Sequence, residues 1–164
     1  MMSKTIHILT GPVKSGKTTR LIAWIRYHEH CAGILAPVID EKKHLYSIHN
    51  EQEFPLERES GTPGQELIEI GRYSFLLSSF EWARNELLTA LTVNPRWFII
   101  DEIGPLELAG KGLEPAVSTI LNKFERAKDH QLILVIRDTL LEQVVSHYQL
   151  EGKYLIDESF LELI

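Results

Sequence analysis

Cysteine, positive charge and long apolar runs are all scarce in this sequence of 164 residues. With Cys31 as the one cysteine there is no internal disulfide framework, and we expect the protein to lie in the reducing cytoplasm. Apolar stretches such as residues 132–136 fall far short of the roughly 20 residues of a membrane-spanning helix. The first residues are not typical of a signal peptide either, so we expect no membrane partner.

Acidic residues outnumber basic ones, 23 to 17, which gives a formal charge of −6. Generic binders of nucleic acid need a surplus of basic side chains, so this balance argues against nucleic acid as a main partner. Nothing in the composition identifies a protein partner. The length, with 44% apolar residues, predicts a single domain over residues 1–164.

Short apolar runs alternate with amphipathic segments along the chain. The runs that predict strands lie at residues 5–10, 32–39, 97–100, 132–136 and 153–156. Apolar side chains at helical spacing predict helices from about Lys17 and over residues 79–91, 113–127 and 140–148. This alternation predicts an α/β fold in three layers around a mostly parallel central sheet.

The most polar region follows the second predicted strand, at residues 44–71. It contains two short strand-like runs, at 45–49 and 53–56, and a turn-forming stretch at 60–64. We interpret it as a β-hairpin or loop excursion from the domain and not as a second domain.

A glycine-rich segment joins the first predicted strand to the first predicted helix. It fits the P-loop pattern G-x-x-x-x-G-K-[ST] with Gly11, Pro12, Val13, Lys14, Ser15, Gly16, Lys17 and Thr18. Such a turn points backbone N–H groups at phosphate oxygens, and the helix adds its positive N-terminal end. Lys17 is predicted to reach the β- and γ-phosphates and Thr18 to hold Mg²⁺. The segment therefore predicts binding of a nucleoside triphosphate such as ATP or GTP.

The apolar run at 97–100 ends in two carboxylates, Asp101 and Glu102. In P-loop proteins an Asp at such a strand end orders the Mg²⁺ shell, so Asp101 is a predicted metal ligand beside Thr18. Glu102 is placed to orient and deprotonate a water in line with the γ-phosphate. This favours hydrolysis over transfer to another acceptor, although a solvated surface acid would look the same in the sequence.

A positive side chain is also expected, to offset charge on the γ-phosphate. Arg137 is the leading candidate because it ends the strand at 132–136, at the edge where open α/β sheets bind ligands. Arg20, Arg58 and Arg72 are the alternatives.

The four residues from Asp101 to Gly104 also match D-x-x-G, the γ-phosphate switch of GTPases. The guanine-reading partner motif N-K-x-D is absent, because Asn122-Lys123 is followed by Phe124-Glu125 inside a predicted helix. Dedicated guanine selectivity is not predicted.

The segment IDEIGPLEL, from Ile100 to Leu108, resembles the DEIG-x-x-EL signature of the small P-loop nucleoside-triphosphatase family, which has cancer-related and thermophile members. The phosphate loop is similar too, with Pro12 and a second threonine, Thr19; Gly33 and residues 70–73 follow in the family's order. The likeness spans nearly the whole chain.

The resemblance implies an Mg²⁺-dependent enzyme that hydrolyses nucleoside triphosphates with broad base tolerance. Asp101 and Glu102 would be its metal and water carboxylates, Thr19 would belong to the nucleotide site, and Gly104 and Glu107 to the segment that shapes it.

Two positions depart from the family pattern. Lys14 stands where a further glycine is usual, and the residues Val38-Ile39-Asp40 replace Glu-Val-Arg after the second strand. Loss of that arginine bears on turnover more than on binding. Two alternatives to a hydrolase therefore stay open: a nucleoside or nucleotide kinase, with its acceptor pocket in the polar region, and a nucleotide-dependent switch protein with little turnover.

Overall fold

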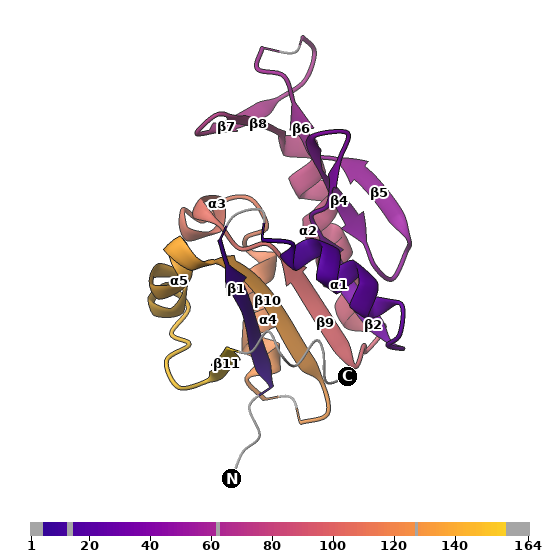
Figure 1. Cartoon of the computed structure of the whole chain (residues 1–164), viewed down its shortest axis with the longest axis vertical. Helices are drawn as coiled ribbons and strands as arrows, with labels where there is room; N and C mark the ends of the chain where they lie inside the picture. The colour runs from indigo at the N-terminus through magenta and orange to yellow at the C-terminus, as the bar shows by residue number, and fades with distance from the viewer. Residues whose placement is uncertain (1–4, 13–14, 62, 127, 157–164) are drawn as a thin grey trace.

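The structure is a computed structural model that describes residues 5–12, 15–61, 63–126 and 128–156 (Figure 1). Its strands are β1 (Ile6–Gly11), β2 (Cys31–Leu35), β3 (Val38–Ile39), β4 (Lys42–Ser47), β5 (Gln52–Pro55), β6 (Glu57–Arg58), β7 (Leu67–Ile70), β8 (Tyr73–Leu76), β9 (Trp97–Asp101), β10 (Gln131–Arg137) and β11 (Tyr154–Ile156). Its helices are α1 (Lys17–Ile25), α2 (Leu77–Thr92), α3 (Pro105–Leu108), α4 (Ala116–Phe124) and α5 (Leu141–His147), with a 3₁₀ turn, η1 (Asp138–Leu140), before α5. Of the helices in these ranges, none combines the length and apolar character needed to cross a membrane.

The central sheet confirms the predicted α/β fold with mostly parallel strands. Five strands run parallel in the order β11-β1-β10-β9-β2, and β4 continues the sheet antiparallel to β2, flanked by β3 and β5. Because β10 lies between β1 and β9, the carboxyl ends of these three strands are neighbours. The phosphate loop, Arg137 and Asp101 follow or end those strands, so the topology brings them to one edge.

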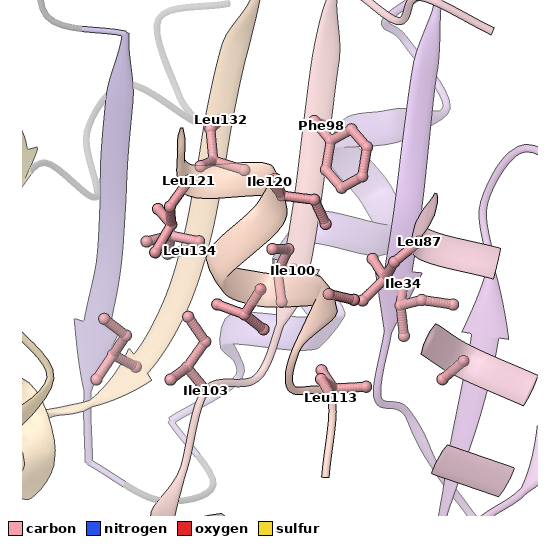
Figure 2. Close-up of a cluster of buried hydrophobic side chains, with 14 of the residues drawn as sticks. Ile34, Leu87, Phe98, Ile100, Ile103, Leu113, Ile120, Leu121, Leu132 and Leu134 are labelled. Atoms are coloured by element: carbon pink, nitrogen blue, oxygen red, sulfur yellow. The ribbon is translucent and has the colours of Figure 1, made fainter. Parts of the chain in front are cut away.

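Alternate residues of the parallel strands face two separate hydrophobic cores. In β9, Phe98 and Ile100 face one core, while Trp97 and Ile99 face the other. The first core includes side chains of α2 and α4, and Figure 2 shows Ile120 of α4 over the strands. The second core includes side chains of α1. Helices thus cover both faces of the sheet, which explains why its central strands are apolar without alternation.

The excursion from the central sheet is longer than the hairpin predicted over residues 44–71. β4 and β5 do form an antiparallel hairpin, but β6, β8 and β7 then form a separate three-stranded antiparallel sheet. In Figure 1 this small sheet lies beyond the edge at which β9 leads towards α3. The sequence did not predict it because its strands have only two to four residues, too few to establish an alternating pattern.

Helix α4 begins later than the helix predicted over residues 113–127. It starts at Ala116, directly after Pro115, because a residue that precedes proline is disfavoured in the helical conformation. Leu113 lies outside the helix but is buried in the first core. It is therefore apolar because it packs in that core, and not because it belongs to the periodic face of a helix. The predicted end, at residue 127, lies outside the described residues.

Candidate functional site

The phosphate loop connects the carboxyl end of β1 to the first turn of α1. Gly16 is the N-cap of α1 and has a φ of 85°, a left-handed conformation that favours glycine. A Cβ atom added there would meet no atom of the described residues within 4 Å, apart from its neighbours in the chain. Thr18 and Thr19 follow in the first helical turn and, with Gly16 and Lys17, line a cleft. Val13 and Lys14, which the motif also includes, lie outside the described residues.

The side chain of Lys17 is buried and folds back over the loop. Its Nζ donates hydrogen bonds to the carbonyl oxygens of Gly11, at 3.0 Å, and Pro12, at 2.7 Å, and to the Ser15 hydroxyl, at 3.1 Å. These acceptors hold the ammonium at the mouth of the loop. Phosphate oxygens are stronger acceptors for an ammonium, so the same group can turn to an incoming polyanion.

Thr18 and Asp101 lie side by side at the edge of the central sheet. The Thr18 hydroxyl donates to Oδ2 of Asp101 across 2.6 Å, and the backbone N–H of Ala36 donates to the same oxygen across 3.2 Å. Asp101 is fully buried, and this burial raises its pKa to about 6 even though the Thr18 hydrogen bond acts in the opposite direction. A buried carboxylate beside a hydroxyl is a place where a cation would be favourable.

The donor set fits Mg²⁺ better than it fits a softer metal. Both groups offer oxygen, and the described residues contain no group of three or more His, Cys, Asp or Glu side chains that could hold a metal ion. Mg²⁺ prefers oxygen and usually takes one or two protein carboxylates together with substrate phosphates and waters.

Glu102 is held between two cations. Its Oε1 lies 3.3 Å from Nζ of Lys43 and 3.2 Å from a terminal guanidinium nitrogen of Arg137. Arg137 is the last residue of β10 and so reaches the site predicted for it. Its Nε is buried and has no hydrogen-bond partner among the described residues, which leaves a donor for an anion at this point.

Of the alternative arginines, Arg72 lines the same cleft, whereas Arg20 and Arg58 are not part of its lining. The Arg72 guanidinium lies over the ring of Tyr73, 5.1 Å from its centroid, and donates to the Tyr73 hydroxyl at 3.0 Å. Nζ of Lys43 is 5.4 Å from the same ring centroid. The excursion therefore contributes two cations around one tyrosine.

These groups line a single cleft of about 810 Å³, within the range of small-molecule sites. One wall is the phosphate loop with Asp101, Glu102 and Arg137; the opposite wall comes from the excursion, including Lys43 and Tyr73. The structure thus brings together predicted residues from three separate segments of the chain: the phosphate loop, the end of β9 and the end of β10.

Lys43 lines the candidate site, and the sequence analysis missed it. It is paired with Val38 in the β3–β4 register, two positions before Asp40, which stands where the family pattern has arginine. A cation therefore reaches the site from the neighbouring strand. Only the register of two short strands reveals this, since Lys43 belongs to no motif.

Glu107 shapes the segment that follows Glu102. Its two carboxyl oxygens accept hydrogen bonds from the backbone N–H groups of Gly104, at 2.8 Å, and Leu113, at 2.9 Å. The side chain is buried, and burial raises its pKa to about 7. It fastens both ends of the turn around α3 and so supports the backbone next to Glu102.

The fold and site can be compared with known proteins. A family model described as NTPase matches residues 6–157. Among solved structures, THEP1 from the hyperthermophile Aquifex aeolicus is similar with a TM-score of 0.70 and 18% identity, over 93% of this chain and 88% of that one. The human cancer-related nucleoside triphosphatase is similar with a TM-score of 0.65 and 20% identity, over 96% and 92% of the two chains. No curated protein sequence matches significantly.

Proposed function

The chain belongs to the small P-loop nucleoside-triphosphatase family and hydrolyses nucleoside triphosphates; from this premise we propose that it cleaves ATP, GTP and related triphosphates to the diphosphate and phosphate, with Mg²⁺ bound. The observation that carries the proposal is the position of Glu102, which is held between Lys43 and Arg137 and adjoins the Thr18–Asp101 pair. A cytoplasmic location belongs to the same proposal and is supported by the lone cysteine.

The phosphate loop binds the triphosphate tail. Backbone N–H groups at the start of α1 face its oxygens, and Lys17 exchanges the loop carbonyls for the β- and γ-phosphates. Thr18 and Asp101 would hold Mg²⁺ through their oxygens, and Thr19 lies on the same wall of the cleft. When bound, the ion neutralises charge that develops on the phosphate oxygens.

Glu102 orients the attacking water and accepts its proton. The two cations on Oε1 fix the direction of the carboxylate, as a group that positions a nucleophile must be fixed. The unpartnered Nε of Arg137 is available to the γ-phosphate, where negative charge grows in the transition state. Lys43 provides a second cation beside Glu102.

Release of inorganic phosphate tests the proposal directly. Purified protein is incubated with ATP, GTP, CTP or UTP, with magnesium or with EDTA, and phosphate is measured by malachite green. We expect release from several triphosphates and none in EDTA. Tight binding without release would identify a switch protein instead, and consumption only in the presence of an acceptor would identify a kinase.

Calorimetry tests the phosphate loop separately. Lys17→Ala is expected to weaken binding of a non-hydrolysable ATP analogue by about tenfold or more, because an ammonium–phosphate contact is lost. An unchanged dissociation constant would contradict the assignment of the loop.

A further inference from the structure

A second cavity, of about 390 Å³, adjoins the nucleotide cleft. The two share Asp101, Glu102 and Arg137 in their walls, whereas none of the described phosphate-loop residues lines the second one. This cavity therefore begins beyond the Thr18–Asp101 pair, on the side of Glu102. A molecule in it would lie next to the end of the triphosphate tail that is cleaved.

This cavity is much larger than a single water nucleophile, and many of its walls are apolar. Its walls include Leu45, Leu56, Ile70, Phe75, Phe80 and Leu113. A water molecule occupies about 30 Å³ and needs polar partners on two to four sides. The volume is instead that of pockets that enclose small organic ligands, which are mostly apolar with a few convergent polar groups.

The walls indicate what kind of ligand fits. The rings of Tyr73 and Phe75 are stacked, with centroids 5.6 Å apart, and Phe80 meets Phe75 edge to face at 6.0 Å. Such a row of aromatic rings suits a flat heteroaromatic ring. The charged groups of the wall are largely engaged with neighbours, since Glu102 pairs with Lys43 and Arg137, and Glu107 accepts from two backbone N–H groups, which favours a neutral ligand.

We propose that this cavity binds a nucleoside, with its base among the aromatic and aliphatic side chains and a sugar hydroxyl at Glu102, and that the enzyme transfers the γ-phosphoryl group to it. The inference rests on the nucleotide site proposed above. The hydroxyl oxygen forms a bond to the γ-phosphorus and its proton passes to the Glu102 carboxylate. The bond from the γ-phosphorus to the bridging oxygen breaks, and the electron pair leaves with the nucleoside diphosphate. The products are a nucleoside monophosphate and a nucleoside diphosphate.

Radiolabelled ATP tests this inference. The protein is incubated with magnesium and [γ-³²P]ATP, alone or with adenosine, guanosine, cytidine, uridine or thymidine, and labelled phosphate and nucleoside monophosphate are separated by thin-layer chromatography. We expect label in the monophosphate of at least one nucleoside. Label in inorganic phosphate alone, with all five nucleosides, would overturn the inference and leave the hydrolase intact. Label that stays in ATP throughout would overturn both.

A pocket-filling variant links any transfer to this cavity. Ile70 lies half-buried at the end of β7, and Ile70→Trp would occupy the space of the base. We expect the ratio of labelled monophosphate to labelled phosphate to fall about tenfold, a change that general inactivation would not produce. Val93→Trp, at a position 55% exposed after α2, is the matched control and should keep the wild-type ratio. An unchanged ratio in a folded Ile70→Trp protein, checked by circular dichroism, would place the acceptor elsewhere and overturn the inference.

Discussion

Thr18 donates its hydroxyl hydrogen to Oδ2 of Asp101 across 2.6 Å, although 83 positions separate the two residues in the chain. The contact joins the first turn of α1 to the carboxyl end of β9. The contact places the two oxygens that are proposed to hold Mg²⁺ side by side. The packing of α1 beside the end of β9 therefore positions this part of the candidate site.

Removal of the Thr18 hydroxyl should therefore weaken the response to magnesium. Thr18→Val keeps the shape of the side chain but removes the hydroxyl, and a hydrogen bond to a charged group contributes about 1.5–3 kcal/mol. We expect kcat/KM for hydrolysis to fall about tenfold or more and the magnesium requirement to rise. Magnesium titrations of phosphate release measure both. Thr18→Ser, which keeps the hydroxyl, should stay close to wild type, and equal losses in the two variants would contradict the metal role.

Glu102→Gln should separate binding from turnover. The amide keeps an oxygen that can accept from Lys43 or Arg137 but cannot accept a proton from water, and such a base contributes about 10²–10⁴-fold. We expect single-turnover hydrolysis to fall by about that factor while the dissociation constant of a non-hydrolysable analogue changes little. Undiminished hydrolysis would show that the base lies elsewhere.

Lys43 is expected to act through Glu102. Lys43→Met removes the cation and should lower kcat about tenfold, and Lys43→Arg should restore most of the activity. In a Glu102→Gln background the same Lys43→Met change should lower kcat by a clearly smaller factor, because residue 102 then carries no charge for Lys43 to pair with. Equal losses of kcat in both backgrounds would assign Lys43 to the nucleotide and not to Glu102.

The parts of the site that lie in contiguous motifs were predictable from the sequence. A glycine-rich turn after a strand specifies its own local structure, and the carboxyl ends of parallel strands meet at one edge of a sheet. That rule places Asp101, Glu102 and Arg137 near the loop once strands are recognised, and the structure brings all three into one cleft. The parallel sheet follows from the same alternation of strands and helices.

Of the wall contributed by the excursion, the sequence analysis named only Arg72, as one of three alternative arginines, and the rest could not be predicted in the same way. Lys43, Arg72 and Tyr73 approach the site through the pairing of strands of two to six residues. Register in such short strands depends on tertiary packing and leaves no periodic signal in the sequence. The second cavity was hidden for the same reason, because its walls combine the small sheet with α2 and α3.

The Glu107 carboxylate should make Gly112 more sensitive to substitution than Gly110. Both glycines have positive φ, 62° and 76°, so alanine at either position costs about 1–2 kcal/mol in backbone strain. A Cβ on Gly112 would also come within 2.0 Å of Oε2 of Glu107, which is held by the Leu113 N–H. A Cβ on Gly110 would meet no atom of the described residues within 4 Å beyond its chain neighbours. We expect urea denaturation to show about 1–3 kcal/mol of extra destabilisation for Gly112→Ala. Equal losses of stability in the two variants would mean that the Glu107 side chain moves away from the added Cβ without a loss of free energy.

The raised pKa of Glu107 should make stability depend on pH. Burial moves this pKa from 4.5 to about 7, so between these values the folded chain retains a proton that the unfolded chain has lost. The free energy of unfolding therefore falls as pH rises through this window, by at most about 3 kcal/mol, and this contribution levels off above pH 7. Glu107→Gln cannot titrate, so urea denaturation of both proteins at pH 5, 6, 7 and 8 isolates the effect, because other groups cancel in the difference. The free energy of unfolding of the wild type minus that of the variant should decline steadily up to about pH 7. A difference that stays constant with pH would mean that the two backbone N–H donors keep Glu107 ionised in spite of its burial.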